Sequence, residues 1–230
     1  MGLVCIAGKA RVGKRRMAGL SLEEAGRAER YRFFRDCAKK TGANVIATGH
    51  TLDDQAETVL MRILKGSSLK GIAGIHPVRD EGGLRVIRPL ISITKEALCR
   101  ELLRDGVPYR RDASNEDTAF FRNAVRHEIM PYLEKHNPRL KRALTALAEH
   151  AREDLQCIND ARKKAGALGT ARNGIIEILL KDIAIQPKAI QKEIARDALA
   201  GAGGDVKKLT HRHWKEIDGL IARKEKGRAC

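Results

Sequence analysis

The sequence predicts an α/β domain built on a parallel sheet, followed by a mainly α-helical domain. The first observation is an apolar run at Asn44–Thr48 that leads through a polar stretch into an amphipathic helix pattern, as strands do in parallel sheets. The second is that apolar residues recur every three or four positions from residue 138 onward. We place the two domains at residues 1–134 and 135–230.

The first domain is expected to open with a short buried strand at residues 3–7 and a basic loop at 8–19. A helix then starts at Ser21, where Ser21 and Glu24 form a capping box, and ends at Gly42. The remaining elements, in chain order, are a strand at 44–48, a helix at 51–65 with Thr51 as N-cap, a loop at 66–71, a strand through Val86 and Ile87, a helix at 94–105 between Thr94 and Gly106, an irregular segment at 108–115, and a helix around 118–132.

Four apolar residues of the helix at 51–65 are expected to face the core: Val59, Leu60, Ile63 and Leu64. In the second domain only helices are expected. They are a long amphipathic helix after Pro138, helices around 175–183 and 187–199, and a basic helix at 206–224 behind a glycine linker at 201–204.

Composition favours a nucleic-acid partner. The 230 residues include 45 basic and 29 acidic side chains, a net charge of +16, which suits a polyanion, although a basic protein with no such partner remains the alternative. The five cysteines are scattered and form no Cys-x-x-Cys pair, which argues against a zinc site or a disulfide framework and fits the reducing cytoplasm. No apolar run approaches the length of a membrane span, so no membrane partner is expected.

Polar groups concentrate where the strand at 44–48 passes into the next helix. His50 precedes the helix, and Asp53, Asp54 and Glu57 fall on its first turn. The helix dipole stabilises carboxylates there, which is enough to explain any one of these acids. Their combination at the carboxyl end of a strand, where α/β domains bind ligands, indicates a site. It could hold an amine or a magnesium ion, or steer a nucleophilic amine toward a phosphate-activated carbon.

A second set of polar residues lies further along the chain. Asp112–Asn115 has the composition of a turn, and Arg122 and Arg126 lie four apart on one helix face. With Arg110 and Arg111 these arginines could hold phosphates, and a solvated basic face is the alternative.

One phosphate-binding pattern is rejected. The segment 8–15 nearly matches the Walker A motif, but Arg15 stands where a serine or threonine would bind magnesium. No strand ending in a Walker B aspartate follows it.

Taken in order, the motifs resemble one family, tRNA(Ile)-lysidine synthase of the PP-loop ATP pyrophosphatase superfamily. The resemblance covers residues 20–140 and is carried by His-x-x-Asp-Asp-Gln-x-Glu-Thr at 50–58, Leu64–Gly74, Arg88-Pro89-Leu90, Asp112-x-Ser-Asn115 and Arg122–Arg126. It implies that the α/β domain is the remainder of a Rossmann-like parallel sheet of the PP-loop ATPase type.

The resemblance also implies an activity. In this family ATP adenylates the wobble cytidine of tRNA(Ile), and the ε-amine of free L-lysine then displaces AMP to give lysidine. The implied cofactors are ATP with Mg²⁺, no metal site of the protein itself is implied, and a homodimer is compatible with the family. Alternatively, the chain is a tRNA-binding module without catalysis.

Each matching residue acquires an implied role. The catalytic set is Asp53, Asp54, Glu57 and Arg122, in which Asp54 and Glu57 would hold the lysine amine, Asp53 would support them and Arg122 would contact the activated intermediate. The residues implied near the nucleotide are Arg27, Gly49 and His50, and those implied to face the tRNA are Lys65, Asn123 and Arg126.

The sequence departs from the family in places. Lys65 and Lys95 stand where the family usually has arginine, which replaces a bidentate contact by a point charge. The phosphate-gripping motif Ser-Gly-Gly-x-Asp-Ser occurs nowhere in the chain. We therefore expect a fragment that lacks the family's first strand–loop–helix units and its C-terminal domain. A tRNA-thiolating relative is a weaker alternative, because those enzymes typically need Cys-x-x-Cys pairs.

Overall fold

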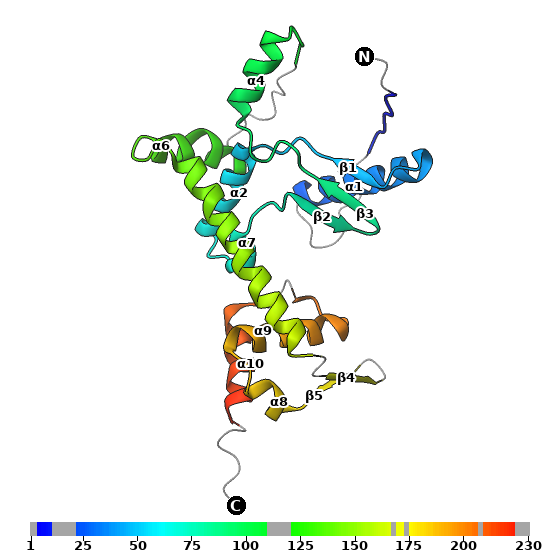
Figure 1. The fold of residues 1–230 in the computed structure, drawn as a ribbon, viewed down its shortest axis with the longest axis vertical. Coiled ribbons are helices and arrows are strands. Elements are labelled where there is room, and N and C mark those ends of the chain that lie inside the picture. The colour runs from blue at the N-terminus through cyan, green and yellow to red at the C-terminus, as the bar shows by residue number, and fades with distance from the viewer. Residues whose placement is uncertain are drawn as a thin grey trace, which may run out of the picture. The chain divides into compact units, whose positions relative to one another are not determined.

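The structure, a computed structural model, describes residues 4–10, 22–109, 121–166, 169–172, 175–206 and 209–223 of the chain (Figure 1). The chain divides into two units, Met1–Ala148 and Glu149–Cys230. The division falls within helix α7 (Leu140–Lys164), and the domain boundary at 134/135 stays a prediction.

A three-stranded sheet organises the first unit. Strands β1 (Val45–Ala47) and β3 (Leu84–Ile87) are parallel, with Ile46 opposite Val86, so both strands lie where they were expected and in a parallel arrangement. Strand β2 (Val78–Glu81) pairs antiparallel with the other edge of β3 and gives the order β1-β3-β2. It was not predicted, because Val-Arg-Asp-Glu shows no alternation of apolar and polar residues.

The hairpin between β2 and β3 turns on two glycines. Gly82 and Gly83 have φ of 58° and 85°, a left-handed backbone that only glycine adopts at low cost in two successive positions. Two-residue hairpin loops need this geometry to match the twist of the strands. The turn thereby fixes the register of β2 on β3.

Two long helices accompany the sheet. Helix α1 (Leu22–Thr41) contacts β1, buries Tyr31 and Ala38, and ends at Gly42 as predicted, with φ of 70°. Helix α2 (Leu52–Leu64) begins after Thr51, also as predicted. The prediction of its buried face was partly wrong, because Ile63 and Leu64 are 42% and 53% exposed.

The buried face of α2 forms the core of the first unit. Ala56, Val59 and Leu60 pack against apolar residues from the segments that follow the sheet, which are Val125, Met130, Leu144 and Ala148. The observed stripe on α2 therefore keeps the helical period but ends one turn earlier than expected.

Shorter elements complete the first unit. Part of the expected loop at 66–71 is helical, as α3 (Leu69–Ile72). Helix α4 (Lys95–Arg104) starts at Thr94, whose Oγ1 accepts from the Ala97 amide at 3.1 Å, as predicted. The helix expected around 118–132 consists of α5 (Phe121–Ala124), a π-helical turn η3 (Val125–Ile129) and α6 (Met130–Glu134).

The strand predicted at residues 3–7 is wrong over its described part. Residues 4–10 belong to no strand or helix, and Val4 is 89% exposed. Gly8 lies against the Phe33 ring of α1, close enough that a Cβ there would meet the ring at 2.4 Å. An apolar run alone does not make a strand without a partner edge. Residues 1–3 and 11–21, including most of the basic loop and the Ser21 cap, lie outside the described residues.

The second unit is mostly helical but contains a hairpin. Helices α8 (Leu180–Ala184), α9 (Lys188–Gly201) and α10 (His211–Arg223) follow α7, and their core is Ile183, Ile190, Ile194 and Ile221. The helix predicted at 175–183 was wrong in its first half, where β5 (Ile175–Ile178) pairs antiparallel with β4 (Gly169–Arg172). The β-branched run at 175–178 favours a strand, and its burial alternates. None of the described helices is long and apolar enough to span a bilayer.

We expect Gly74→Ala to lower the free energy of unfolding by about 2–4 kcal/mol in a urea titration. Gly74 has φ of +65°, and a Cβ there would lie 2.7 Å from Oε1 of the buried Gln55, which accepts from the Ile75 amide. Gly66→Ala is the matched control, because Gly66 has φ of +66° with nothing within 4 Å. It should lose only the stability that comes from placing a side chain on a left-handed backbone, about 1–2 kcal/mol. Equal losses would show that Gln55 does not hold this loop.

Candidate functional site

The amino end of α2 lies at the carboxyl ends of the parallel strands. The Thr48 amide donates to Ile87 O at 3.0 Å, so the chain leaves β1 beside the end of β3. Thr51 then starts α2 through a reciprocal cap, in which its side chain accepts from the Asp54 amide while its own amide donates to Asp54 Oδ2 at 2.9 Å. Ligands bind at this edge in α/β sheets.

Asp54 and Glu57 pair with two arginines from α5 and η3. Arg122 donates through Nη2 to Asp54 Oδ1 at 3.0 Å and through Nε to Glu57 Oε2 at 3.1 Å. Arg126 donates through Nε to Glu57 Oε1 at 2.6 Å and through Nη2 to Asp54 Oδ1 at 3.3 Å. We call these four residues the acid–arginine cluster. All four carboxylate oxygens accept a hydrogen bond, since Asp54 Oδ2 is used by the cap.

The cluster is partly withdrawn from water. The Glu57 side chain is 4% exposed, and Arg126 and Arg122 are 23% and 30% exposed. The hydrogen bond to Glu57 raises the pKa of Arg126, against the lowering effect of burial. The two carboxylates and two guanidiniums balance in charge, which a buried acid requires.

The two arginines come from a short helix and from the π-helical turn that follows it. Arg122 lies in α5 and Arg126 in η3, and both reach the same two carboxylates. An ordinary helix already brings positions four apart onto one face. The wider π turn changes that spacing locally, and such turns occur frequently at functional sites.

Asp53 points away from its neighbour Asp54. Its Oδ2 accepts from the Lys95 amide at 2.7 Å, at the start of α4, and its Oδ1 lies 3.1 Å from Lys141 Nζ. Lys141 also lies 3.3 Å from Glu134 Oε1. Burial alone would lower the pKa of Lys141, but the two carboxylates outweigh it and raise that pKa. Sequence reasoning missed Lys141, because its site partner Asp53 lies far away along the chain.

His50 lies beside the cluster as a neutral imidazole. Its Nδ1 is 2.8 Å from Thr48 Oγ1. Burial lowers the pKa of His50, Asp54 opposes that shift, and the guanidiniums of Arg88, Arg122 and Arg27 reinforce it.

The other expected site residues differ in exposure and in their neighbours. Arg27 is exposed, with its Cζ 4.9 Å from the centroid of the Tyr31 ring. Lys65 Nζ lies 5.1 Å over the Phe121 ring, and Asn123 is buried. Gly49 is exposed and a Cβ there would meet nothing, so packing does not require glycine. Arg110, Arg111 and the Asp112–Asn115 turn lie outside the described residues.

The predicted alternative of a magnesium site finds no support in the geometry. Among the described residues, no group of three or more His, Cys, Asp or Glu side chains could hold a metal ion. Asp54 and Glu57 face guanidiniums instead, and these occupy the oxygens a cation would need.

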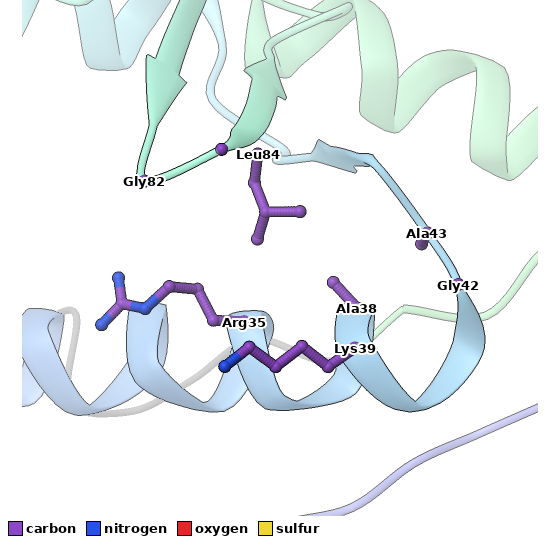
Figure 2. Close-up of a pocket in the computed structure, with 8 residues that line it drawn as sticks. Arg35, Ala38, Lys39, Gly42, Ala43, Gly82 and Leu84 are labelled. Carbon is purple, nitrogen blue, oxygen red and sulfur yellow. The ribbon is translucent and has the colours of Figure 1, made fainter.

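A hollow of about 350 Å³ lies at the opposite end of the sheet (Figure 2). Arg35, Ala38 and Lys39 of α1 line one side, and the Gly82–Leu84 turn lines the other, with Leu84 pointing toward the helix. It is next to the amino ends of β1 and β3, so it is separate from the acid–arginine cluster.

An α/β unit with polar residues at the carboxyl edge of its parallel strands has the arrangement of a PP-loop domain. Residues 1–133 match the family model of the PP-loop domain, an ATP-binding family, and the chain belongs to that family.

Its relatives include several tRNA(Ile)-lysidine synthases. The chain is 35% identical over 205 residues to the one of Geobacter sulfurreducens, covering 88% of this chain and 43% of the relative. It is 39% identical over 186 residues to that of Methylobacterium nodulans, covering 80% of this chain and 54% of the relative. To the synthase of Geobacillus kaustophilus the chain is 36% identical over 201 residues, covering 83% of this chain and 41% of the relative. The chain thus spans about half the length of the curated relatives it matches.

Arg126→Met should destabilise the native state by about 2 kcal/mol or more, because it leaves Glu57 buried with only Arg122 to balance it. Arg32→Met is the control, since Arg32 pairs with Glu29 on the exposed face of α1 and should cost less than about 1 kcal/mol. Urea unfolding measures both. Similar losses in the two variants would mean that the cluster contributes no more than a surface pair.

Acidification should destabilise the protein through His50. Because folding lowers the pKa of His50 below 6.5, the unfolded chain binds the proton more readily. The stability contributed by the neutral ring is therefore complete above pH 6.5 and is lost as the pH falls through 6.5 toward the folded-state pKa. Unfolding curves between about pH 7.5 and pH 5.5 should show a smaller loss for His50→Gln than for the unaltered chain. An equal loss of stability in His50→Gln and in the unaltered chain would rule out a contribution from His50.

Proposed function

We propose that this chain carries the amine-binding part of a tRNA(Ile)-lysidine synthase. The observation that carries the proposal is the acid–arginine cluster at the carboxyl edge of the parallel strands, built from residues of the segments that match lysidine synthases. The proposed substrates are tRNA(Ile), free L-lysine and ATP. The proposed location is the cytoplasm, and a homodimer stays a prediction.

The proposed reaction joins an amine to an activated base. ATP supplies the activation by transferring its adenylyl group to the wobble cytidine, with release of diphosphate. The lysine ε-amine, without its proton, then attacks the activated carbon and displaces AMP. The protein must hold a cationic amine, release its proton and stabilise a phosphate leaving group.

An exchange of partners within the cluster would meet these needs. Asp54 Oδ1, Asp54 Oδ2 and Glu57 Oε2 each already accept two hydrogen bonds, so an ammonium that binds both carboxylates would replace a guanidinium. Arg122 is the more exposed arginine, and it would move from Asp54 Oδ1 to the adenylate phosphate while the lysine amine takes its place. Charge balance around the buried Glu57 is kept while the ammonium replaces the guanidinium, and it changes only when the amine gives up its proton to a carboxylate of the cluster or to water.

Asp53 would act as a positioning residue. Its bonds to the Lys95 amide and Lys141 hold the start of α4 and α7 against α2, so it would orient Asp54 and Glu57 rather than touch the amine.

Arg27, Gly49 and His50 are proposed to line the nucleotide side. The neutral His50 ring could accept a hydrogen bond or a proton there. Gly49 leaves open space for the nucleotide. Mg²⁺ would accompany ATP, held by phosphate oxygens and waters as that ion prefers, since the cluster carboxylates are bonded to arginines.

Lys65, Asn123 and Arg126 are proposed to face the tRNA. Lys65 is exposed beside the Phe121 ring, where a base or phosphate could be met. Arg126 would reach RNA only while keeping its Glu57 bond. The net charge of +16 supports a polyanionic partner, and binding should weaken steeply with salt.

The test is ATP-dependent incorporation of labelled lysine into a tRNA(Ile) transcript by the protein extended upstream to include the Ser-Gly-Gly-x-Asp-Ser motif, which this chain does not contain. Asp54→Asn and Glu57→Gln should lower the rate about 10²-fold or more, because each removes a charge that opposes the ammonium. Asp80→Asn is the control, since the Asp80 side chain is 82% exposed in β2, and its rate should be unchanged. Undiminished rates in Asp54→Asn and Glu57→Gln would refute the assigned roles. Salt-sensitive tRNA binding with no lysine incorporation would instead establish a non-catalytic tRNA-binding module.

A further inference from the structure

Three arginines surround one buried tyrosine in the first unit. Tyr31 of α1 is buried, and the Cζ atoms of Arg27 and Arg79 lie 4.9 Å and 5.9 Å from its ring centroid. The Arg27 Nη2 also lies 3.4 Å from the Tyr31 hydroxyl. The third guanidinium, that of Arg88, lies close enough to Tyr31 for that tyrosine to oppose the lowering of the Arg88 pKa by burial.

Arg88 is the unusual member of this group. It is 4% exposed, and its Nη1 donates to His76 O at 2.5 Å. Its Nε is buried without a hydrogen-bond partner, and no carboxylate of the described residues pairs with it. A buried charge without a counter-charge is costly, which lowers the pKa of Arg88 through burial and through the nearby Arg79 and Arg27.

The two arginine groups of this unit differ in their charge balance. Arg122 and Arg126 are matched by Asp54 and Glu57. Among the three arginines around Tyr31, Arg79 pairs with Glu81, whereas no recorded ion pair between described residues involves Arg27 or Arg88. The region therefore carries surplus positive charge, and the same field reaches His50.

The surplus charge lies where α/β domains bind ligands. Arg88 directly follows β3, and Arg79 of β2 is opposite Val86 near the same end of that strand. Arg27 is exposed and the Arg79 side chain is 42% exposed, so both can reach a ligand from solvent. Guanidinium groups bind phosphate oxygens through paired N–H donors.

We propose that Arg27, Arg79 and Arg88, gathered around Tyr31, form a phosphate-binding site separate from the acid–arginine cluster. Arg27 and Arg79 are the arms that contact the phosphate, and Arg88 is a fixed buried charge that attracts it. The site depends on the proposed function only for the source of the phosphate, which is a nucleotide or an RNA backbone.

The first test is thermal unfolding of the whole chain in inorganic phosphate, against chloride at equal ionic strength. Phosphate at about ten times its Kd should raise the Tm by about 3–5 °C. Arg88→Met should lose this rise. Arg85→Met should keep it, because Arg85 is on the same strand but is 64% exposed and pairs with Asp80. No rise in the unaltered chain, or an equal rise in Arg88→Met, overturns the proposal.

An exposed variant guards against misfolding of Arg88→Met. Arg27→Gln removes one arm from the surface of α1, and it should weaken phosphate binding about tenfold in an equilibrium titration. Unchanged phosphate affinity in a folded Arg27→Gln overturns the assignment of that arm.

Competition identifies the source of the phosphate. Phosphate binding should be displaced either by AMP or by a short single-stranded RNA, and the displacing ligand should itself bind about tenfold more weakly to Arg27→Gln. Displacement by neither overturns the proposal. A phosphate response without lysine incorporation retains this site and refutes the proposed function, whereas lysine incorporation with an equal phosphate response in Arg88→Met refutes only this site.

Discussion

Glu57 is 3% exposed, and a carboxylate in that position requires positive charge beside it. The requirement fixes where α5 and η3 pack, because their arginines must reach α2. The apolar neighbours of Glu57 on α2, Val59 and Leu60, join Val125 and Met130 in one core. The electrostatic and apolar contacts between these segments therefore reinforce each other.

The remaining polar residues of the first turns of α2 hold other parts of the unit. Gln55 binds the loop at Ile75, and Asp53 binds the amide that starts α4 and the ammonium of Lys141. Successive helix positions point about 100° apart, so adjacent polar residues serve different neighbours. One short segment thus organises the surroundings of the site as well as the site itself.

Local patterns predicted what depends on local interactions. The starts of α2 and α4 followed from Thr51 and Thr94, and the end of α1 followed from Gly42, because caps involve neighbouring residues. The two apolar runs predicted strands in a parallel sheet, and β1 and β3 do pair in parallel, although β1 is mostly exposed rather than covered on both faces. The strand β2 and the first half of the helix at 175–183 were misjudged, since each of these short strands forms by pairing with its hairpin neighbour, which the pattern of the single segment does not show.

The residues of the site could be predicted, but not their contacts. Asp54, Glu57, Arg122 and Arg126 all stand in motifs that the sequence shows, yet the ion pairs join positions 65 to 72 residues apart. The opposite directions of Asp53 and Asp54, and the role of Lys141, depend on the packing of α4 and α7. The unbalanced charge of Arg88 likewise appears only once its burial is known.

The reciprocal cap at the start of α2 gives Asp54 two separate tasks. Oδ2 is held by the Thr51 amide and hydroxyl, and Oδ1 is turned to the arginines. The carboxylate therefore cannot rotate freely, and Oδ1 is fixed in direction. Its acceptor geometry is set before any ligand arrives, so a ligand bears little of the entropic cost of ordering it. A stronger pull on Oδ1 would strain the first turn of α2, which links occupancy of the site to the integrity of that helix.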